Sequence, residues 1–223
     1  MTFLPASLLM VASVGLHLAA ALPAIAQPGE ALKIVTLGTS LSARGGWQEP
    51  LRRSLSECLN RNVAIVNLAK AGMTSDWGLT QIDKVLAERP NIVLVEFAVN
   101  DAALDNFLPL SRSGANMTGI ITRLRESETR PAVYVMAMNP VSGMRGMIRP
   151  FLGQYDEMHA AIARKWGAGV IDHRPAWAML SDEERDEAIA DGTHPDPATA
   201  GRVMLPGLVR VLGGSDCSTA KTE

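Results

Sequence analysis

Short apolar runs recur along the chain at regular intervals. They are rich in Val, Ile and Leu and are bounded by polar or turn-forming residues, a pattern typical of strands buried on both faces. The runs are Leu32 to Leu37, Val63 to Leu68, Ile92 to Ala98, Ala132 to Met138 and Ala168 to Asp172. We therefore predict five buried strands.

The segments between these runs carry apolar residues at helical spacing. They are Trp47 to Leu59, Ser75 to Glu88, Ala115 to Glu126, Phe151 to Trp166 and a last helix near Pro197 to Leu212. Alternating strands and helices predict a parallel sheet covered on both faces. With right-handed crossovers this gives a three-layer α/β/α sandwich in the flavodoxin-like strand order 2-1-3-4-5.

The chain has 223 residues, 47% of them hydrophobic, which favours one domain over two. Its first segment has no charged side chain before Glu30 and ends in the small-x-small pattern Ala24-Ile25-Ala26. This pattern predicts a signal peptide at 1–26, cleaved on export to the periplasm or medium, with an uncleaved anchor as the alternative. We expect one domain at 27–212, a tail at 213–223 and no membrane span after cleavage.

The charge pattern limits the class of partner. Lys plus Arg total 21 and Asp plus Glu total 23, so the formal charge is -2. A surface this balanced does not favour nucleic acid or anionic membrane. Outside the signal, the histidines other than His194 are His159 and His173, and neither has the spacing of a metal site. We expect no metal and no organic cofactor.

The two cysteines are Cys58, late in the first helix, and Cys217, just beyond the last. In the predicted strand order these helices are neighbours on one face of the sheet, which favours a disulfide in an oxidising compartment. Two separate thiols remain the alternative.

The first strand runs into Gly38-Thr39-Ser40-Leu41, which places Ser40 at the carboxyl end of a parallel strand, where open α/β sheets build their sites. A turn or capping serine is the alternative. Near the other end of the chain, Asp191 and His194 lie three residues apart just before the last helix. That spacing lets the carboxylate hold one ring nitrogen while the other accepts a proton from a serine.

Two further strand ends carry polar or glycine positions. The second strand is followed by Gly72, and the third by Asn100 and Asp101. The Ser40 and Gly72 amides and the Asn100 side chain supply three donors for a developing oxyanion, whereas Asp101 is expected to cap the segment after its strand. Taken singly, Gly72 is equally typical of a helix start and Asn100-Asp101 of a turn, without any functional role.

Together, Gly38-Thr39-Ser40-Leu41, Gly72, Asn100-Asp101 and Asp191-x-x-His194 resemble the SGNH hydrolases, also called the GDSL esterase and lipase family. The resemblance covers essentially the whole mature chain. It implies a Ser40, His194 and Asp191 triad with an oxyanion hole of Ser40, Gly72 and Asn100. Thr39 stands where the family usually has Asp, and Ala98 where it usually has Gly.

The remaining candidates concern substrate. Trp47 and Trp77 lie a few residues after Ser40 and Gly72. They are interpreted either as rim residues that contact substrate or as core residues that begin amphipathic helices. The segment Asn139 to Pro150 is rich in Gly, Pro and Met and contains Arg145 and Arg149. It is typical of a substrate loop for either an apolar or an anionic ligand, and solvated arginines are the alternative.

These observations predict a serine esterase that releases short acyl groups, above all acetyl, from a small-molecule or carbohydrate ester outside the cytoplasm. Lysophospholipase, arylesterase or thioesterase activity on longer chains is one alternative, and acyl transfer to a sugar hydroxyl is another. From a different class, a non-catalytic carbohydrate-binding protein would keep the same fold.

Overall fold

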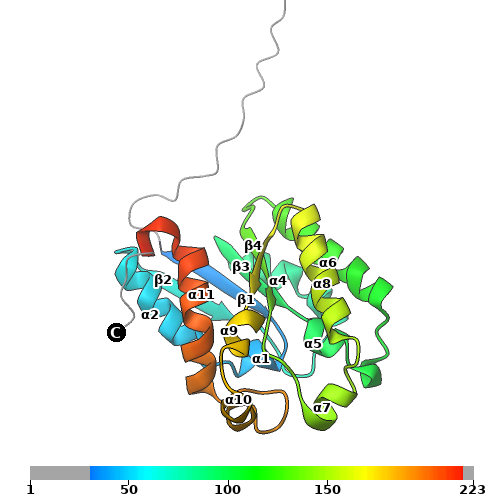
Figure 1. Cartoon of the computed structure of the whole chain (residues 1–223). Coiled ribbons are helices and arrows are strands. Elements are labelled where there is room, and N and C mark those ends of the chain that lie inside the picture. The colour runs from blue at the N-terminus through cyan, green and yellow to red at the C-terminus, as the bar shows by residue number, and fades with distance from the viewer. Residues whose placement is uncertain (1–30, 218–223) are drawn as a thin grey trace, which may run out of the picture. The chain divides into compact units, whose positions relative to one another are not determined.

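A computed structural model describes residues 31–217 of the chain (Figure 1). The predicted signal peptide at 1–26 and the last part of the predicted tail lie outside the described residues. At the centre is a parallel sheet in the order β2-β1-β3-β4-β5, as predicted. The strands are β1 (Leu32–Gly38), β2 (Val63–Asn67), β3 (Ile92–Glu96), β4 (Ala132–Ala137) and β5 (Gly169–Asp172).

The pleat of the sheet divides the core in two. In β1, Ile34 faces one helical layer and its neighbour Val35 faces the other, and both are fully buried. In β3, Leu94 and Val95 divide in the same way. Successive side chains of a strand point to opposite faces, so an apolar run without alternation is explained by helices on both sides.

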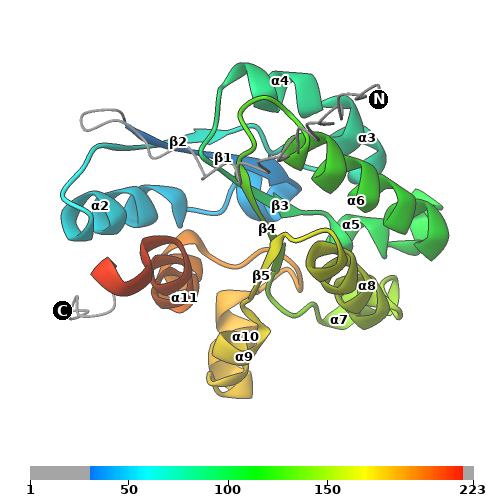
Figure 2. The same ribbon diagram turned by 90° about the horizontal axis from the view of Figure 1, so that it is seen from above.

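The helical layers follow the predicted segments (Figure 2). One face of the sheet is covered by α2 (Gln48–Cys58) and α11 (Pro197–Cys217), which contact each other along their lengths. The other face is covered by α3 (Ser75–Thr80), α4 (Ile82–Ala87), α6 (Leu110–Arg125) and α8 (Leu152–Lys165). The predicted helix over Ser75 to Glu88 is therefore two short helices, which meet at Gln81.

Several short helices were not predicted, because each is too brief to show helical periodicity. Most of them lie at or near the carboxyl ends of the strands (Figure 1). They are α1 (Ser40–Ala43), α5 (Ala98–Asp101), η1 (Leu104–Asn106), α7 (Gly143–Met147), α9 (Arg174–Ala178) and α10 (Asp182–Ala188). Ala98, predicted as the end of a strand, instead begins α5.

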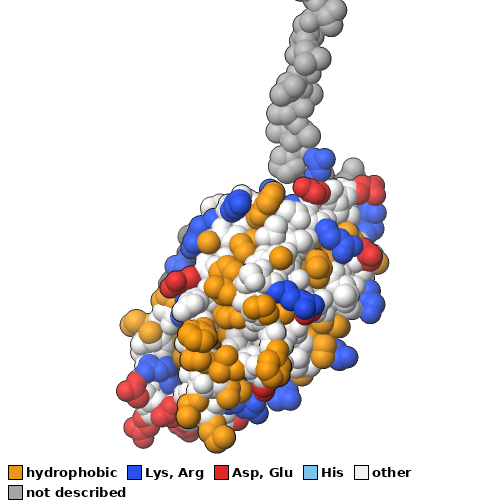
Figure 3. Space-filling view, turned by 90° about the vertical axis from the view of Figure 1, so that its right-hand side faces the viewer, with side chains coloured by type: hydrophobic (Ala, Val, Ile, Leu, Met, Phe, Trp, Pro, Cys, Tyr) orange, Lys and Arg blue, Asp and Glu red, His pale blue; other side chains and the backbone are white. Residues whose placement is uncertain are grey.

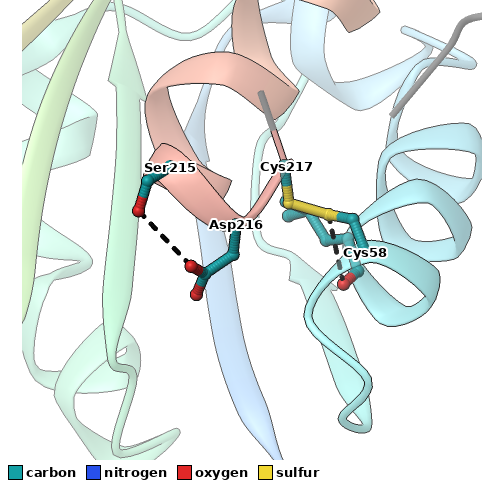
Figure 4. The surroundings of a disulfide bond; sticks show 5 residues. Cys58, Ser215, Asp216 and Cys217 are labelled. Atoms are coloured by element: carbon teal, nitrogen blue, oxygen red, sulfur yellow. Dashed lines mark hydrogen bonds between the residues drawn. A yellow bond between two sulfur atoms is a disulfide. The ribbon is translucent and has the colours of Figure 1, made fainter. Parts of the chain in front are cut away.

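The predicted disulfide joins Cys58 to Cys217 across the α2 and α11 layer (Figure 4). The last helix runs beyond its predicted end at Leu212, with Gly214 outside helical geometry, and so carries Cys217 back to the end of α2. Within 31–217, the helices are too short or too polar to pass through a lipid bilayer.

Candidate active site

Ser40 occupies the sharp connection between β1 and α1. Thr39 is the N-cap of α1, and its hydroxyl oxygen accepts the Leu41 amide at 3.2 Å. Capping by Thr ends the strand and starts the helix within one residue. Ser40, at the first position of α1, is buried except for its access to a cavity that it lines.

Asp191 and His194 lie on a tight turn between α10 and α11. Oδ1 of Asp191 accepts the backbone amides of Thr193 at 2.8 Å and His194 at 2.7 Å, which closes the turn. Gly192 has a φ of 77°, and a Cβ there would lie 2.6 Å from the Ser142 carbonyl oxygen. Glycine is required on both grounds, since it adopts left-handed backbone readily and permits a close approach.

The turn brings the predicted triad together. His194 Nδ1 lies 2.6 Å from Asp191 Oδ2, and His194 Nε2 lies 2.7 Å from Ser40 Oγ, across 154 residues of sequence. With the proton on Nδ1 held by the carboxylate, Nε2 is free to accept the serine proton. Partial burial opposes ionisation of Asp191, but the hydrogen bonds from His194 and Thr193 outweigh it and lower the Asp191 pKa to about 2.

The loop after β4 braces this turn. Asn139 Nδ2 donates to the Thr193 carbonyl oxygen at 2.8 Å, and the Ser142 amide donates to the Gly192 carbonyl oxygen at 2.9 Å. Part of the segment predicted as a substrate loop therefore holds the histidine turn in place.

Gly72, in the loop after β2, and Asn100, in α5, face the same cavity. Gly72 has a φ of 78°, and a Cβ there would meet open space. Its left-handed backbone exposes the loop to the cavity without a side chain. Asn100 Nδ2 donates one hydrogen bond to the Met73 carbonyl oxygen at 2.9 Å. That bond orients the amide and leaves the second N–H of Nδ2 for a ligand.

The cavity has a volume of about 220 Å³ and polar and charged walls. Arg145, predicted as a substrate contact, is one of its lining residues. The full lining is Ser40, Arg44, Ala71, Gly72, Asn100, Asp105, Asn106, Arg145, Arg149, Thr193 and His194. Ala98 is not among them, so its methyl group does not narrow this cavity; it packs against Ala102 and Tyr155 instead.

Of the two interpretations of Trp47 and Trp77, packing in the core fits the structure better than contact with substrate, since neither residue lines the cavity. Trp47 is fully buried beneath α2 and belongs to the core on that face of the sheet. Trp77 packs edge-on against Phe97 at 6.5 Å between ring centroids. Both residues pack as large aromatics usually do at the start of an amphipathic helix, Trp47 fully buried and Trp77 partly buried.

Glu96 is a residue of the site that the prediction missed. The last residue of β3, it is 1% exposed, and Oε1 accepts the Thr39 amide at 2.6 Å. The Thr39 hydroxyl lies 3.0 Å from Oε2. Burial raises the pKa of Glu96 to about 7, against the opposing hydrogen bonds from Thr39. A charged residue in an otherwise apolar strand was the signal available in the sequence.

Asp101 was expected to cap the segment after β3. It does not, and instead joins a buried network. Its Oδ1 accepts the Ser75 amide at 2.8 Å, and its Oδ2 accepts the Ser113 hydroxyl at 2.6 Å. Ser113 Oγ also lies 2.7 Å from His159 Nε2. Burial lowers the His159 pKa to about 3, so this imidazole is neutral. The network ties the start of α3, just after the Gly72 loop, to α5 with its Asn100.

The two remaining histidines lie apart from the cavity. His159 belongs to the network just described, and His173 is buried at the end of β5, with its backbone amide bonded to the Ala137 carbonyl oxygen. Within the described part of the chain, His, Cys, Asp and Glu side chains form no group of three or more that could hold a metal ion.

The sequence matches the GDSL-like lipase/acylhydrolase family over residues 35–201. A search of curated proteins found no significant match. Among solved structures, Axe2, an acetylxylan esterase from Geobacillus stearothermophilus, is similar with a TM-score of 0.73 at 16% identity, over 86% of this chain and 99% of that one. TesA is similar with a TM-score of 0.64 at 19% identity, over 81% of this chain and 99% of that one. Axe2 was also solved as catalytic mutants in which a serine, an aspartate or a histidine is replaced by alanine.

Proposed function

The chain belongs to the GDSL-like lipase/acylhydrolase family and is a carboxylic ester hydrolase, and we propose that Ser40 is its nucleophile, His194 its general base and Asp191 the residue that orients the histidine. The observation that carries this proposal is the pair of short contacts made by His194, at 2.6 Å to Asp191 and 2.7 Å to Ser40. A nucleophile in contact with a base, and a base held by a third group, is the arrangement that activates a serine.

The proposed reaction has two stages. Ser40 Oγ attacks the ester carbonyl carbon while its proton passes to His194 Nε2, and the carbonyl electron pair moves to oxygen. The Ser40 and Gly72 amides and the free Asn100 N–H would hold that oxyanion. Its collapse expels the alcohol, which takes the proton from His194, and leaves an acyl group on Ser40. Water then attacks the acyl-enzyme in the same way, which releases the acid and restores the serine.

The cavity favours a short acyl group on a polar alcohol. At about 220 Å³, with arginine, aspartate and asparagine among its walls, it offers polar groups rather than an apolar tunnel for a long chain. Acetyl is therefore the proposed acyl group and a carbohydrate the proposed alcohol. The similarity to an acetylxylan esterase supports this choice, although it extends to the fold alone at this identity.

The Cys58–Cys217 disulfide supports an extracytoplasmic location, because such bonds persist in oxidising compartments. We propose that residues 1–26 are a cleaved signal peptide, and that the protein acts in the periplasm or medium as one hydrolase domain.

Longer acyl chains are the second candidate, and one observation favours them. Leu104 and Phe107, on either side of Asp105 and Asn106 in sequence, are 53% and 89% exposed. Met144 and Met147, on either side of Arg145, are 82% and 76% exposed. Figure 3 shows hydrophobic side chains spread from the top to the bottom of the face that it presents, among polar and charged ones. An apolar rim of this kind suits an alkyl chain.

The test is hydrolysis of 4-nitrophenyl esters from acetate to octanoate by the wild-type protein and a Ser40→Ala variant. We expect the rate to fall with chain length and to vanish in the variant. Faster turnover of octanoate would favour the lysophospholipase or thioesterase alternative. Acyl groups appearing on an added sugar in place of free acid would identify a transferase, which uses the same residues. Equal rates for both proteins would contradict the proposal.

A further inference from the structure

Three arginines line the cavity that contains Ser40 and His194. Arg44 ends α1, Arg145 lies in α7, and Arg149 lies between α7 and α8. The acidic side chain in the lining is Asp105. The cavity wall therefore carries an excess of positive charge on a chain whose formal net charge is -2.

Arg149 is the most informative of the three, because it is only 8% exposed. Its Nε donates to the Val99 carbonyl oxygen at 2.6 Å and its Nη1 to the Arg145 carbonyl oxygen at 3.0 Å. These bonds fix the guanidinium beside Asn100, which directly follows Val99. They satisfy two of its five N–H groups and leave its charge unneutralised.

None of the three cavity arginines has a carboxylate partner within 4.0 Å in residues 31–217. Other arginines do form ion pairs there, among them Arg52, Arg53, Arg112, Arg123, Arg174 and Arg185. Burial lowers the pKa of Arg149, the charge of Asp105 raises it and the charge of Arg145 lowers it. Arg149 thus retains a buried charge that is compensated only at a distance.

A buried cation without a counterion is unfavourable, and a protein keeps one where a ligand supplies the opposite charge. The planar fork of a guanidinium matches the two oxygens of a carboxylate or phosphate. We infer that the ester substrate carries an anionic group, and that Arg149 binds it with help from Arg145. This inference rests on the proposed function.

The position of the arginines restricts how far the anion lies from the ester. Arg145 and Arg149 line the same cavity of about 220 Å³ as the Ser40 and His194 pair. The acyl group and the anion must therefore belong to one small unit, such as a single acidic sugar residue that bears both an acetyl ester and a carboxylate. A phosphorylated sugar presents the same chemistry.

The test compares three acetyl esters that differ only at carbon 6 of the sugar. They are a mono-acetylated methyl glucoside, the corresponding methyl glucuronoside, and the corresponding glucoside 6-phosphate, with acetate release as the readout. We expect kcat/KM to be about tenfold higher for the uronate, the phosphate or both than for the neutral ester. The preferred anion identifies the source of the charge, and added salt should reduce the preference.

Variants assign the preference to the arginines. Arg145→Gln, at an exposed helical position, and Arg149→Gln should both bring the ratio of anionic to neutral kcat/KM toward one, whereas Arg149→Lys should keep part of it. Arg164→Gln is the matched control, because Arg164 is exposed on α8 and does not line the cavity. It should keep the wild-type ratio. If Arg149→Gln does not fold, Arg145→Gln and Arg149→Lys decide the result.

Two outcomes would overturn the inference while the proposed function stands. One is equal kcat/KM for all three esters in the wild-type protein. The other is an equal loss of kcat/KM on neutral and anionic esters in the arginine variants. That result would mean that the arginines stabilise the oxyanion rather than bind a separate anionic group of the substrate. If instead no ester is hydrolysed faster by wild-type protein than by Ser40→Ala, the proposed function itself is wrong.

Discussion

The backbone amide of Thr39 donates a 2.6 Å hydrogen bond to the buried carboxyl group of Glu96, 57 residues away at the end of the neighbouring strand. The Thr39 hydroxyl adds a second contact at 3.0 Å. The residue before the proposed nucleophile is therefore held by a side chain from β3. Thr39 stands where the family usually has Asp, and here the loop is supported by a side chain of another strand.

The first prediction concerns pH and stability. The Glu96 pKa is about 7 in the folded protein, against 4.5 for an ordinary glutamate. Below pH 4.5 the group is protonated whether folded or unfolded; as pH rises through 7, the unfolded chain ionises first and stability is lost. The difference corresponds to about 3–4 kcal/mol, at about 1.4 kcal/mol for each tenfold change in proton affinity.

The measurement is the free energy of unfolding of wild-type and Glu96→Gln proteins by denaturant from pH 4 to 8. Asp156, whose pKa is about 6, and other shifted groups are present in both proteins and cancel. We expect the wild type to lose stability relative to the variant as pH rises. A difference independent of pH would show that Glu96 does not titrate in this range.

The second prediction tests the buried network. Replacing Ser113 by Ala leaves Asp101 and His159 without their shared hydroxyl partner in a dry environment, which should cost about 1–3 kcal/mol of stability. Ser111→Ala, on an exposed position of the same helix, should stay within about 0.5 kcal/mol of wild type. Chemical denaturation of both variants checks the difference, and equal stabilities would argue that the network is not coupled to the fold.

The disulfide gives the third prediction. Cys58 and Cys217 are 159 residues apart, so removal of the bond opens a large loop in the unfolded chain and raises its conformational entropy. The double variant Cys58→Ser with Cys217→Ser should lose about 3–5 kcal/mol in the free energy of unfolding. A reductant should bring the wild type to the level of the variant and leave the variant unchanged. No response of the wild type to reduction would be contrary to this expectation.

The fourth prediction concerns the oxyanion. Asn100→Ala removes the side-chain donor and should lower kcat about 100-fold or more, with a smaller change in KM, because the donor acts on charge that develops in the transition state. Circular dichroism and thermal unfolding serve as controls, since Asn100 also bonds the Met73 carbonyl oxygen. A wild-type kcat in this variant would show that Asn100 does not stabilise the oxyanion.

The sheet was predictable because its evidence is local. Runs such as Ile92 to Ala98 are apolar without alternation, and their order follows from the handedness of crossovers. The positions of Ser40, Asp191 and His194 were also predictable, since each follows or precedes a regular element and the family pattern covers all three. The disulfide followed from the same topology.

The misses share a physical cause, which is dependence on contacts distant in sequence. Trp47 and an exposed rim tryptophan look alike in sequence, and only the packing of α2 on the sheet distinguishes them. Asp101 has no capping signal of its own, and its partners Ser75 and Ser113 come from two other helices. Glu96 is interpretable only once Thr39 is known to lie beside it.

The most direct test of Ser40 as the nucleophile is to find which residue a serine-directed inhibitor modifies. Wild-type, Ser40→Ala and Ser42→Ala proteins are treated with a fluorophosphonate, digested and mapped by mass spectrometry, with ester hydrolysis measured in parallel. We expect a single adduct on Ser40 in the wild-type and Ser42→Ala proteins, and neither an adduct nor hydrolysis in Ser40→Ala. An adduct on another residue, with hydrolysis retained in Ser40→Ala, would contradict it.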